Sequence, residues 1–323
     1  MNRLTMSALV VLMGTAAPAL AAVEGGFERT LTVTGAVTLS ATSGSGGIDV
    51  TTGPDGTVRV KGVIHANSWG ASSDEIARAV KALEANPPIV QQGNTVRIGE
   101  IEDERIARLV SVSYTITVPR QTSVTSKTGS GAQSIASLAG PVSASSGSGG
   151  LTVAAIDGAV DVRTGSGSIR VERAEGGLSA SSGSGSISVA AAAGDMRVRT
   201  GSGSIEVRQA ASNTAEISSG SGHIRVSDLK GGIKATTASA GIEIAGTPTA
   251  DWRTSTSSGS IRLEIPADAS FRLDAHTSSG SIRTDHTLNG MTTGRRDLTG
   301  TVGGGGVLVE ARSSSGSITV GRR

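Results

Sequence analysis

The chain has 323 residues, of which 46 are glycine, five are aromatic (two Phe, one Tyr and two Trp) and none is cysteine. The lack of cysteine excludes disulfides, iron–sulfur clusters, thiolate zinc sites and cysteine nucleophiles, and the scarcity of rings argues against the single thick core of an ordinary α/β enzyme. The 29 Lys and Arg residues nearly cancel the 27 Asp and Glu residues, so we expect no nucleic-acid partner. A hydrophobic share of 37% argues against disorder. These values favour a thin core repeated many times.

Residues 1–21 have the pattern of a cleaved signal peptide. Arg3 is followed by an apolar stretch from Ala8 to Met13, and small residues stand at Ala19 and Ala21 as the cleavage rule requires. The stretch is too short to span a bilayer, and no later segment has the 18 or so apolar residues of a membrane helix. The sequence therefore predicts an exported protein, periplasmic or extracellular at the cell surface, with no transmembrane segment after signal cleavage.

Residues 22–126 are expected to form an N-terminal β-rich module that carries one helix. Most of the segment alternates apolar and polar residues, which is typical of half-buried strands. Ser72 and Glu75 have the spacing of a capping box, apolar residues follow at helical intervals, and Asn86-Pro87-Pro88 ends the pattern, so a helix is predicted near 73–85. The acidic run from Glu100 to Glu104 is interpreted as a solvated loop.

Residues 127–323 repeat the phrase Thr/Ser-Gly-Ser-Gly-Ser-Ile-x-Val. The spacings of its key aliphatic residue are 18, 18, 18, 19, 18, 19, 21 and 36. The key positions are Leu151, Ile169, Ile187, Ile205, Ile224, Ile242, Ile261, Ile282 and Ile318. We interpret the last gap as two periods, in which one coil has lost its phrase and contains Gly303-Gly304-Gly305-Gly306 instead.

The neighbouring apolar positions keep the same period, so each repeat holds two short strands. Nine residues before the key aliphatic stand Val142, Val160, Leu178, Met196, Ala215, Ile233, Trp252, Leu273 and Val309. A third short side is expected around Ile156, Ala174, Ala192 and Leu229. One unit of this length cannot bury its own apolar face, but units stacked at strand spacing, ~4.8 Å, form a continuous narrow core. We predict an all-β fold, a parallel β-solenoid of about 18 residues per coil, right-handed as parallel crossovers are.

The Gly-Ser corners and the last coil of the predicted solenoid each have an expected structural role. Glycines are expected to provide positive φ at the tight corners, and the neighbouring Ser and Thr to bond to backbone or to form hydroxyl ladders. The last coil, 307–320, shows no capping element, so it is expected to expose a sheet edge that permits edge-to-edge self-association. Arg322 and Arg323 are interpreted as possible guards of that edge.

No catalytic, cofactor-binding or metal-binding residues are predicted. The Gly-Ser phrase lacks the Lys-Ser/Thr of a phosphate-binding loop, and its turns lack the aspartates of the calcium-binding nonapeptide roll. Asp157, Asp161 and Asp195 fall in separate columns, and His276 and His286 are interpreted as surface residues. Of the two tryptophans, Trp252 is expected in the core and Trp69 beside the helix.

The outward-facing residues of the second strand form a column of alternating charge. We interpret them as charges that neutralise one another along the stack, and they are Glu206, Arg225, Glu243 and Arg262.

The mature chain resembles a bacterial family of exported β-strand-repeat proteins described as putative adhesins, a domain of unknown function. The resemblance rests on Gly44-Ser45-Gly46-Gly47-Ile48-Asp49-Val50, on Val96-Arg97-Ile98 after the helix, on Tyr114-Thr115-Ile116-Thr117-Val118-Pro119, on the Ser-Gly-Ser-Ile repeats and on the closing Ser314-Ser315-Gly316-Ser317-Ile318-Thr319-Val320. It implies a β-solenoid with a role in the cell envelope, and no catalytic residues.

Three functions compete at this point. The first is a non-enzymatic, adhesin-like protein of the cell envelope that presents a solenoid face to a protein or glycan partner. The second is a structural, self-assembling envelope protein. The third is a polysaccharide-active β-helix enzyme, which needs a cluster of carboxylates in one groove.

Overall fold

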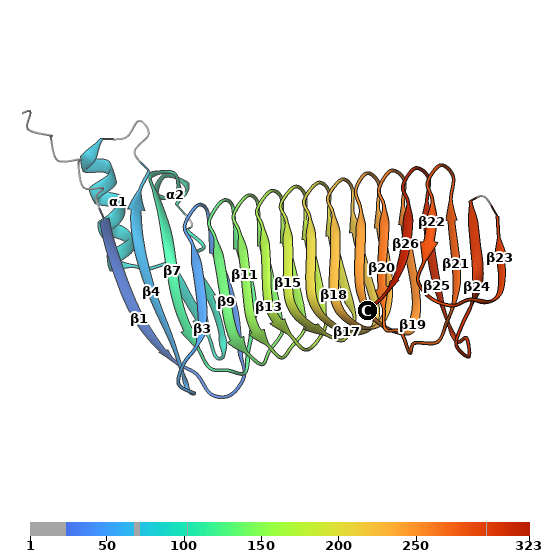
Figure 1. Cartoon of the computed structure of the whole chain (residues 1–323). Helices are drawn as coiled ribbons and strands as arrows, with labels where there is room; N and C mark the ends of the chain where they lie inside the picture. The colour runs from blue at the N-terminus through green and yellow to red at the C-terminus, as the bar shows by residue number, and fades with distance from the viewer. Residues whose placement is uncertain (1–23, 68–71, 102, 295) are drawn as a thin grey trace, which may run out of the picture.

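The protein is a rod of stacked coils, seen in a computed structural model that describes residues 24–67, 72–101, 103–294 and 296–323 (Figure 1). The described residues contain 26 strands, all joined in one sheet, and two helices. The sheet folds over a narrow core, so that each coil contributes one strand to a first layer and one to a second layer. The prediction of a parallel β-solenoid is confirmed.

The first layer begins with a hairpin, continues with parallel strands and ends with a second hairpin. Its strands in spatial order are β5 (Ile89–Gln92), β6 (Thr95–Ile98), β2 (Val37–Ser43), β8 (Thr122–Thr128), β10 (Val142–Ser146), β12 (Val160–Thr164), β14 (Leu178–Ser182), β16 (Met196–Thr200), the second halves of β17 (Ile205–Ser219), β18 (Ile224–Thr237) and β19 (Ile242–Thr256), then β25 (Val307–Ser313), β21 (Phe271–Thr277), β24 (Asp297–Val302) and β23 (Asn289–Thr293).

The second layer begins with three antiparallel strands, continues in parallel and ends with a parallel strand. Its strands in spatial order are β1 (Glu24–Thr32), β4 (Thr57–Ala66), β7 (Val110–Val118), β3 (Ile48–Thr52), β9 (Gln133–Leu138), β11 (Leu151–Ile156), β13 (Ile169–Ala174), β15 (Ile187–Ala193), the first halves of β17, β18 and β19, then β20 (Ile261–Ile265), β26 (Ile318–Arg322) and β22 (Ile282–Thr284).

The columns read from the sequence are register columns of the sheet. Leu151 pairs with Ile169, which in turn pairs with Ile187, and Val142 pairs with Val160. The inward side chains of both layers are almost completely buried, and Trp252 is among them with its indole Nε1 donating to the Gly231 carbonyl at 2.8 Å. The third side is also present, since its residues are buried and paired in register, as Ile156 is with Ala174.

The glycines of the repeated phrase have a different role from the one expected. None of the glycines of the Gly-Ser-Gly turns has a positive φ. Instead, the coils approach so closely at this corner that a Cβ on Gly185 would lie 1.9 Å from the carbonyl oxygen of Gly167 in the coil before it. The prediction of positive φ was therefore wrong at these corners. Glycine at this corner therefore avoids a collision with the backbone of the neighbouring coil, although Ala238 and Ala240 occupy the two positions in one coil.

A ladder of buried hydroxyls beside these glycines confirms the expectation for Ser and Thr. In each typical coil the hydroxyl accepts a hydrogen bond from the amide three residues later and donates to a carbonyl of the adjacent coil. Thr200 Oγ1, for example, accepts from Gly203 N at 3.2 Å and donates to Gly185 O at 2.9 Å. The ladder residues that repeat both bonds are Ser146, Thr164, Ser182, Thr200, Ser219, Thr256, Ser313 and Thr277.

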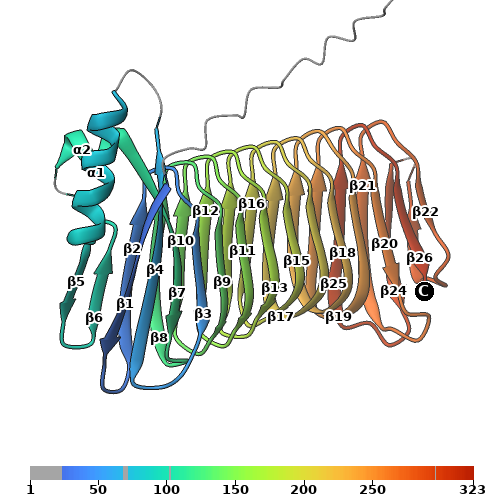
Figure 2. The same ribbon diagram turned by 90° about the vertical axis from the view of Figure 1, so that its left-hand side faces the viewer.

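Two helices stand at the N-terminal end of the stack (Figure 2). The first, α1 (Ser73–Ala85), has the predicted limits and the predicted capping box, and it buries Ile76, Ala79, Val80 and Leu83. The second, α2 (Glu104–Leu109), follows Asp103, whose carboxylate accepts from Arg105 N. The prediction of one helix was thus incomplete, because Asp103 at the end of the acidic run caps a short helix where a solvated loop was expected.

The N-terminal segment is built into the coil stack. Strands β2 and β3 pair in parallel with β8 and β9 on one side and with β6 and β7 on the other. The boundary proposed between residues 126 and 127 falls inside β8, and the pairing continues across it without interruption.

The C-terminal coil lies inside the stack, which corrects two predictions. Strand β25 lies between β19 and β21, and β26 lies between β20 and β22, so coil 307–320 has no free edge. The gap of 36 residues contains no lost coil, because residues 285–306 include the antiparallel strands β23 and β24 that cover β21. Arg322 and Arg323 do not guard an edge, since they contact Thr287 and Asp228.

Candidate functional site

An open groove of about 750 Å³ crosses six coils on the first layer. Its floor follows the start of strands β8 to β16 and of the second half of β17, and its walls are mostly small and hydroxyl residues. We call it the first-layer groove, and it is lined by Ser123, Val124, Thr125, Pro141, Val142, Ser143, Ala159, Val160, Asp161, Gly176, Gly177, Leu178, Ser179, Asp195, Met196, Arg197, Thr214 and Glu216.

Small residues create the groove. Ser143 and Ser179 occupy the outward column in which Arg197 and Glu216 stand further along the rod. Gly177 lies beside them at the turn. Because these side chains are short, the surface is hollowed between the larger residues, while the apolar residues Val142, Val160 and Leu178 beneath it stay buried. The signal was present in the sequence as a run of small outward residues, but the inward columns alone did not reveal it.

Four charged side chains stand in the groove, and most of them have partners. Glu216 accepts hydrogen bonds from Arg197 Nε at 2.9 Å and from Arg199 at 3.0 Å. The hydrogen bond from Arg197 is the main cause that lowers the pKa of Glu216, with Arg199 adding to it, so this carboxylate is ionised at neutral pH. Asp195 is exposed at the turn and has no ion-pair partner among the described residues.

Asp161 presents one oxygen without a partner. Its Oδ2 accepts from Arg163 at 2.8 Å, whereas its Oδ1 is buried and accepts no hydrogen bond from the described part of the protein. A buried acceptor without a donor costs free energy, about 1–3 kcal/mol for a neutral group. A ligand that brings an N–H or O–H to Asp161 would remove this cost.

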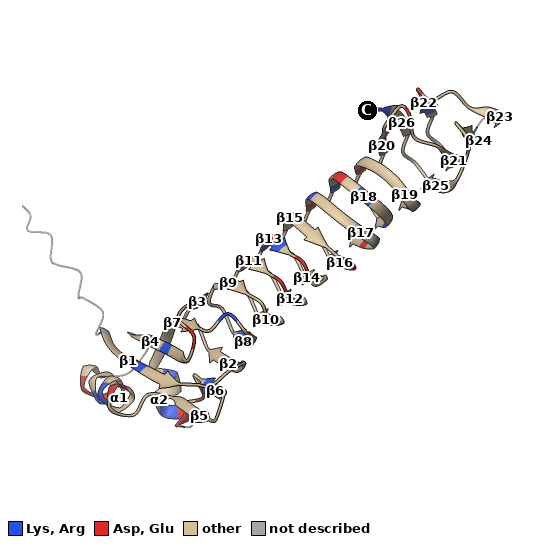
Figure 3. Ribbon diagram, turned by 90° about the horizontal axis from the view of Figure 1, so that it is seen from below, with Lys and Arg blue, Asp and Glu red and all other residues tan. Residues whose placement is uncertain are grey.

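The outward column of the second layer behaves as predicted. Arg225 and Glu243 form an ion pair between adjacent coils at 2.8 Å, and the hydrogen bond with Glu243 raises the pKa of Arg225. Glu206 pairs with Arg208 at 3.1 Å in its own strand, so the charges neutralise one another within coils as well as between them. In the ribbon seen from below, basic and acidic positions are interspersed along the described part of the rod (Figure 3).

The other residues considered from the sequence do not form a common site. Asp157 pairs with Arg120 at 2.6 Å, and His276 Nδ1 lies 2.5 Å from Asp297. His286 is buried, with its ring centre 5.2 Å from that of Phe271. Among the residues that the structure describes, no three His, Cys, Asp or Glu side chains form a group able to hold a metal ion. Trp69 and the predicted signal peptide lie outside the described residues.

The architecture defines a β-solenoid of two mainly parallel layers, the first of which has a hairpin at each end. The family model described as Toastrack DUF4097 matches residues 64–321, and the chain belongs to this family. That description is of a domain of unknown function and specifies no catalytic activity. No curated protein matches the chain significantly. None of the described helices has the length and apolar character needed to cross a membrane.

Three solved structures of low sequence identity resemble the chain. One described as a putative adhesin from Parabacteroides distasonis is 11% identical, with a TM-score of 0.44, over 92% of this chain and 97% of that one. A putative adhesin from Bacteroides fragilis is 14% identical, with a TM-score of 0.37, over 92% and 97%. A putative lipid binding protein from Parabacteroides distasonis is 14% identical, with a TM-score of 0.39, over 92% and 96%. At these TM-scores the likenesses carry no functional argument.

Proposed function

We propose that the protein is a non-enzymatic, exported protein of the cell envelope, adhesin-like in its role, that binds a protein or glycan partner in the first-layer groove. The observation that carries the proposal is the groove itself, an open channel of about 750 Å³ on a rigid face, lined by hydroxyls and carboxylates. Ligand sites are concave and hold a few polar groups that orient the ligand.

The shape of the groove favours an extended partner. Six coils at strand spacing extend about 24 Å along the rod, since five intervals of ~4.8 Å separate them. An extended peptide of about seven residues has this length at ~3.3 Å per residue. Hydroxyls of Ser143 and Ser179, together with Asp161 and Asp195, offer hydrogen-bond acceptors along the channel.

The electrostatics of the groove favour binding over catalysis. Glycoside hydrolysis needs one carboxylic acid with a raised pKa to protonate the leaving group. Glu216 has the opposite shift, because two guanidinium groups stabilise its ionised form. Asp161 is held by Arg163. The alternative of a polysaccharide-active enzyme is therefore the weaker one.

The test compares two tryptophan substitutions in one coil. Ser179→Trp fills the groove, whereas Ser188→Trp places the same ring on the outward column of the second layer, nine residues later. Binding of the mature chain to envelope fractions, glycan panels and whole cells is measured. We expect Ser179→Trp to weaken binding at least about ten-fold, which corresponds to about 1.4 kcal/mol, and Ser188→Trp to leave it unchanged.

Other results would contradict the proposal in distinct ways. Equal binding by both variants would show that the partner binds outside the first-layer groove. The absence of saturable binding by the parent chain would remove the adhesin-like role altogether, and release of reducing ends from a polysaccharide would show an enzyme. Fractionation of the native host, with detection of the protein in periplasm, membrane and medium, tests export and its final location.

A further inference from the structure

The inserted position of the C-terminal coil, residues 307–322, suggests a second interaction. The coil occupies a space between the coil formed by β19 and β20 and the coil formed by β21 and β22, and it pairs with both throughout. We call this space the slot. The segment that fills it comes last in the chain, although two coils that precede it in sequence are its neighbours.

The slot is complementary to this segment in its interior. Val309, Ala311 and Ile318 are fully buried in it. The hydroxyl ladder passes through the inserted coil without interruption. Ser313 Oγ donates to Gly259 O at 3.0 Å on one side, and Thr277 Oγ1 donates to Gly316 O at 2.9 Å on the other.

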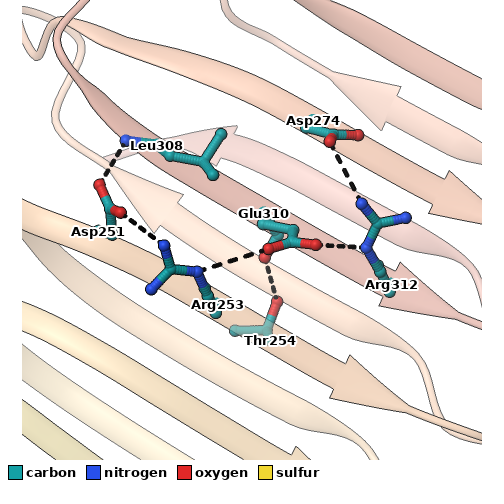
Figure 4. Close-up of polar contacts among 7 residues, drawn as sticks. All are labelled: Asp251, Arg253, Thr254, Asp274, Leu308, Glu310 and Arg312. Carbon is teal, nitrogen blue, oxygen red and sulfur yellow. Dashed lines mark hydrogen bonds and ion pairs between the residues drawn. The ribbon is translucent and has the colours of Figure 1, made fainter.

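The outer face of the slot adds charge complementarity (Figure 4). Glu310 lies between Arg253 of β19, at 3.7 Å, and Arg312, with which it forms a short ion pair. Arg312 also reaches Asp274 of β21 at 3.3 Å. Acidic and basic groups thus alternate across the three strands. A segment that fits the slot must carry an acid and a base in these two places, as residues 307–322 do.

The inserted coil is connected to the preceding strand β24 by a run of four glycines. Gly303, Gly304, Gly305 and Gly306 cross the start of β21, since Val302 and Val307 both pair with Phe271 on its opposite sides. Three of the four glycines have positive φ. Four residues without side chains can adopt another path at low steric cost, which favours exchange of the element that follows them between two copies.

We propose that the slot also accepts residues 307–322 of a second copy of this chain, so that two copies form a reciprocal, coil-exchanged dimer. Its occupant follows from the complementarity above, because the segment that matches the ladder, the apolar column and the charges is this coil itself. The exchanged and unexchanged forms make the same contacts within the slot. Their ratio therefore depends on concentration, and exchange becomes favourable near the effective concentration of the linked coil, on the order of millimolar for a short flexible linker.

Engineered cysteines test the exchange without interference, because the natural sequence has none. Arg262 of β20 and Thr319 of β26 are register partners on the outer face of the second layer. Adjacent strands are ~4.8 Å apart, which suits a disulfide. Chains with Arg262→Cys and chains with Thr319→Cys are refolded together at about 1 mM, diluted to about 10 μM and oxidised. The matched control replaces Arg262→Cys by Arg170→Cys, in the same outward column of a distant coil.

The proposal expects a mixed disulfide dimer that forms roughly a hundred-fold faster than in the Arg170→Cys control, since exchanged coils hold the two thiols at millimolar effective concentration. Equal rates in both mixtures overturn it. A single chain with both Arg262→Cys and Thr319→Cys reports on folding, because it should form an internal disulfide and remain monomeric. Failure of that internal disulfide also overturns the proposal, because the coil would then not occupy the slot.

One competing outcome has its own signature. Residues 271–284 carry the same repeat columns as the inserted coil, so a vacated slot could close by stacking β22 directly on β20. In the native fold Arg262 and Arg283 are two strands apart, ~9.6 Å, which is too far for a disulfide. If a chain with Arg262→Cys and Arg283→Cys forms the internal disulfide, the vacated slot closes within one chain. That result would overturn the proposal that the slot accepts the coil of a second copy.

Discussion

Arg253 and Glu310 are register partners on adjacent strands although 57 positions separate them in the sequence. Their side chains meet on the outer face of the first layer, with Arg253 Nε 3.7 Å from Glu310 Oε2. Glu310 is the less exposed of the two, at 21% against 55%, and its carboxylate also pairs with Arg312. This contact joins a coil to its insertion site, a relationship that the repeat period does not encode.

Replacement of Glu310 should reveal how much these charges contribute. Glu310→Gln keeps the shape of the side chain and removes its charge, so we expect the free energy of unfolding to fall by about 0.5–1 kcal/mol, the range of exposed ion pairs. The loss should shrink at about 1 M salt, where screening is strong. Urea unfolding at low and high salt measures both values.

A matched control separates insertion from general surface charge. Glu264→Gln removes a similar carboxylate whose partner Arg262, at 4.0 Å, belongs to the same coil. We expect little change for this variant. If both variants lose the same free energy, the network around Glu310 has no special role in holding the inserted coil.

The two glycines of one turn should respond differently to the same substitution. A Cβ on Gly46 would lie 2.1 Å from the carbonyl oxygen of Val112, whereas a Cβ on Gly44 would meet nothing within 4 Å. Gly46→Ala should therefore destabilise the protein by about 1–3 kcal/mol or more, because backbone must move. Gly44→Ala should be neutral or stabilise by up to about 1 kcal/mol, because it restricts the unfolded chain. Thermal unfolding of the two variants decides the matter, and equal melting temperatures would refute the close-approach explanation.

The sequence was sufficient to predict the coil and its register. Ile187 and Ile205 stand 18 residues apart, and this period defines the inward columns because each ladder repeats one chemical environment. The helix at 73–85 was equally accessible, since the capping box of Ser72 and Glu75 is a local signal. Features that depend on neighbouring residues in one coil could therefore be predicted from the sequence.

Features that depend on the spatial order of the coils could not be predicted from the sequence. Ile261, Ile282 and Ile318 have the same local pattern, so the period cannot tell that Ile318 lies between the other two. The reason for glycine in the repeated phrase was missed for a related reason. A side chain at Gly185 would collide with the backbone of the adjacent coil, and this contact is not visible within one repeat. The groove depends on small outward residues such as Ser179, which a search for apolar columns passes over.

The hydroxyl ladder offers a test of buried hydrogen bonding. Thr200→Val keeps the size of the side chain but leaves Gly203 N and Gly185 O without this partner. Each buried group left unpaired costs about 1–3 kcal/mol, so we expect a loss of at least about 1 kcal/mol in the free energy of unfolding. Thr200→Ser retains the hydroxyl and matches the neighbouring Ser182 and Ser219, so it should lose much less. Denaturant unfolding compares the three proteins. A loss for serine equal to that for valine would show that packing of the methyl group, and not the hydroxyl, stabilises the ladder.

A buried histidine closes the C-terminal end of the core. His286 is 5% exposed, its ring meets the ring of Phe271 edge to face at 81°, and its Nε2 lies 3.2 Å from the Gly321 carbonyl. Burial is the main cause that lowers its pKa. The bond to Gly321 and the nearby Asp285 oppose this shift, and Arg322 adds to it. The folded protein therefore favours the neutral ring.

This shift predicts that the protein loses stability as the pH falls. The unfolded chain binds a proton at His286 near its ordinary pKa of about 6.5, before the folded protein does, so protonation favours unfolding below that pH. The stability contributed by the neutral ring is complete above about pH 6.5 and is lost as the pH falls through the lower pKa of the folded state. His286→Leu cannot titrate, so its free energy of unfolding should decline less steeply than that of the parent between about pH 7.5 and 5. Urea unfolding across this range measures both slopes, and parallel slopes would mean that other groups cause the pH dependence.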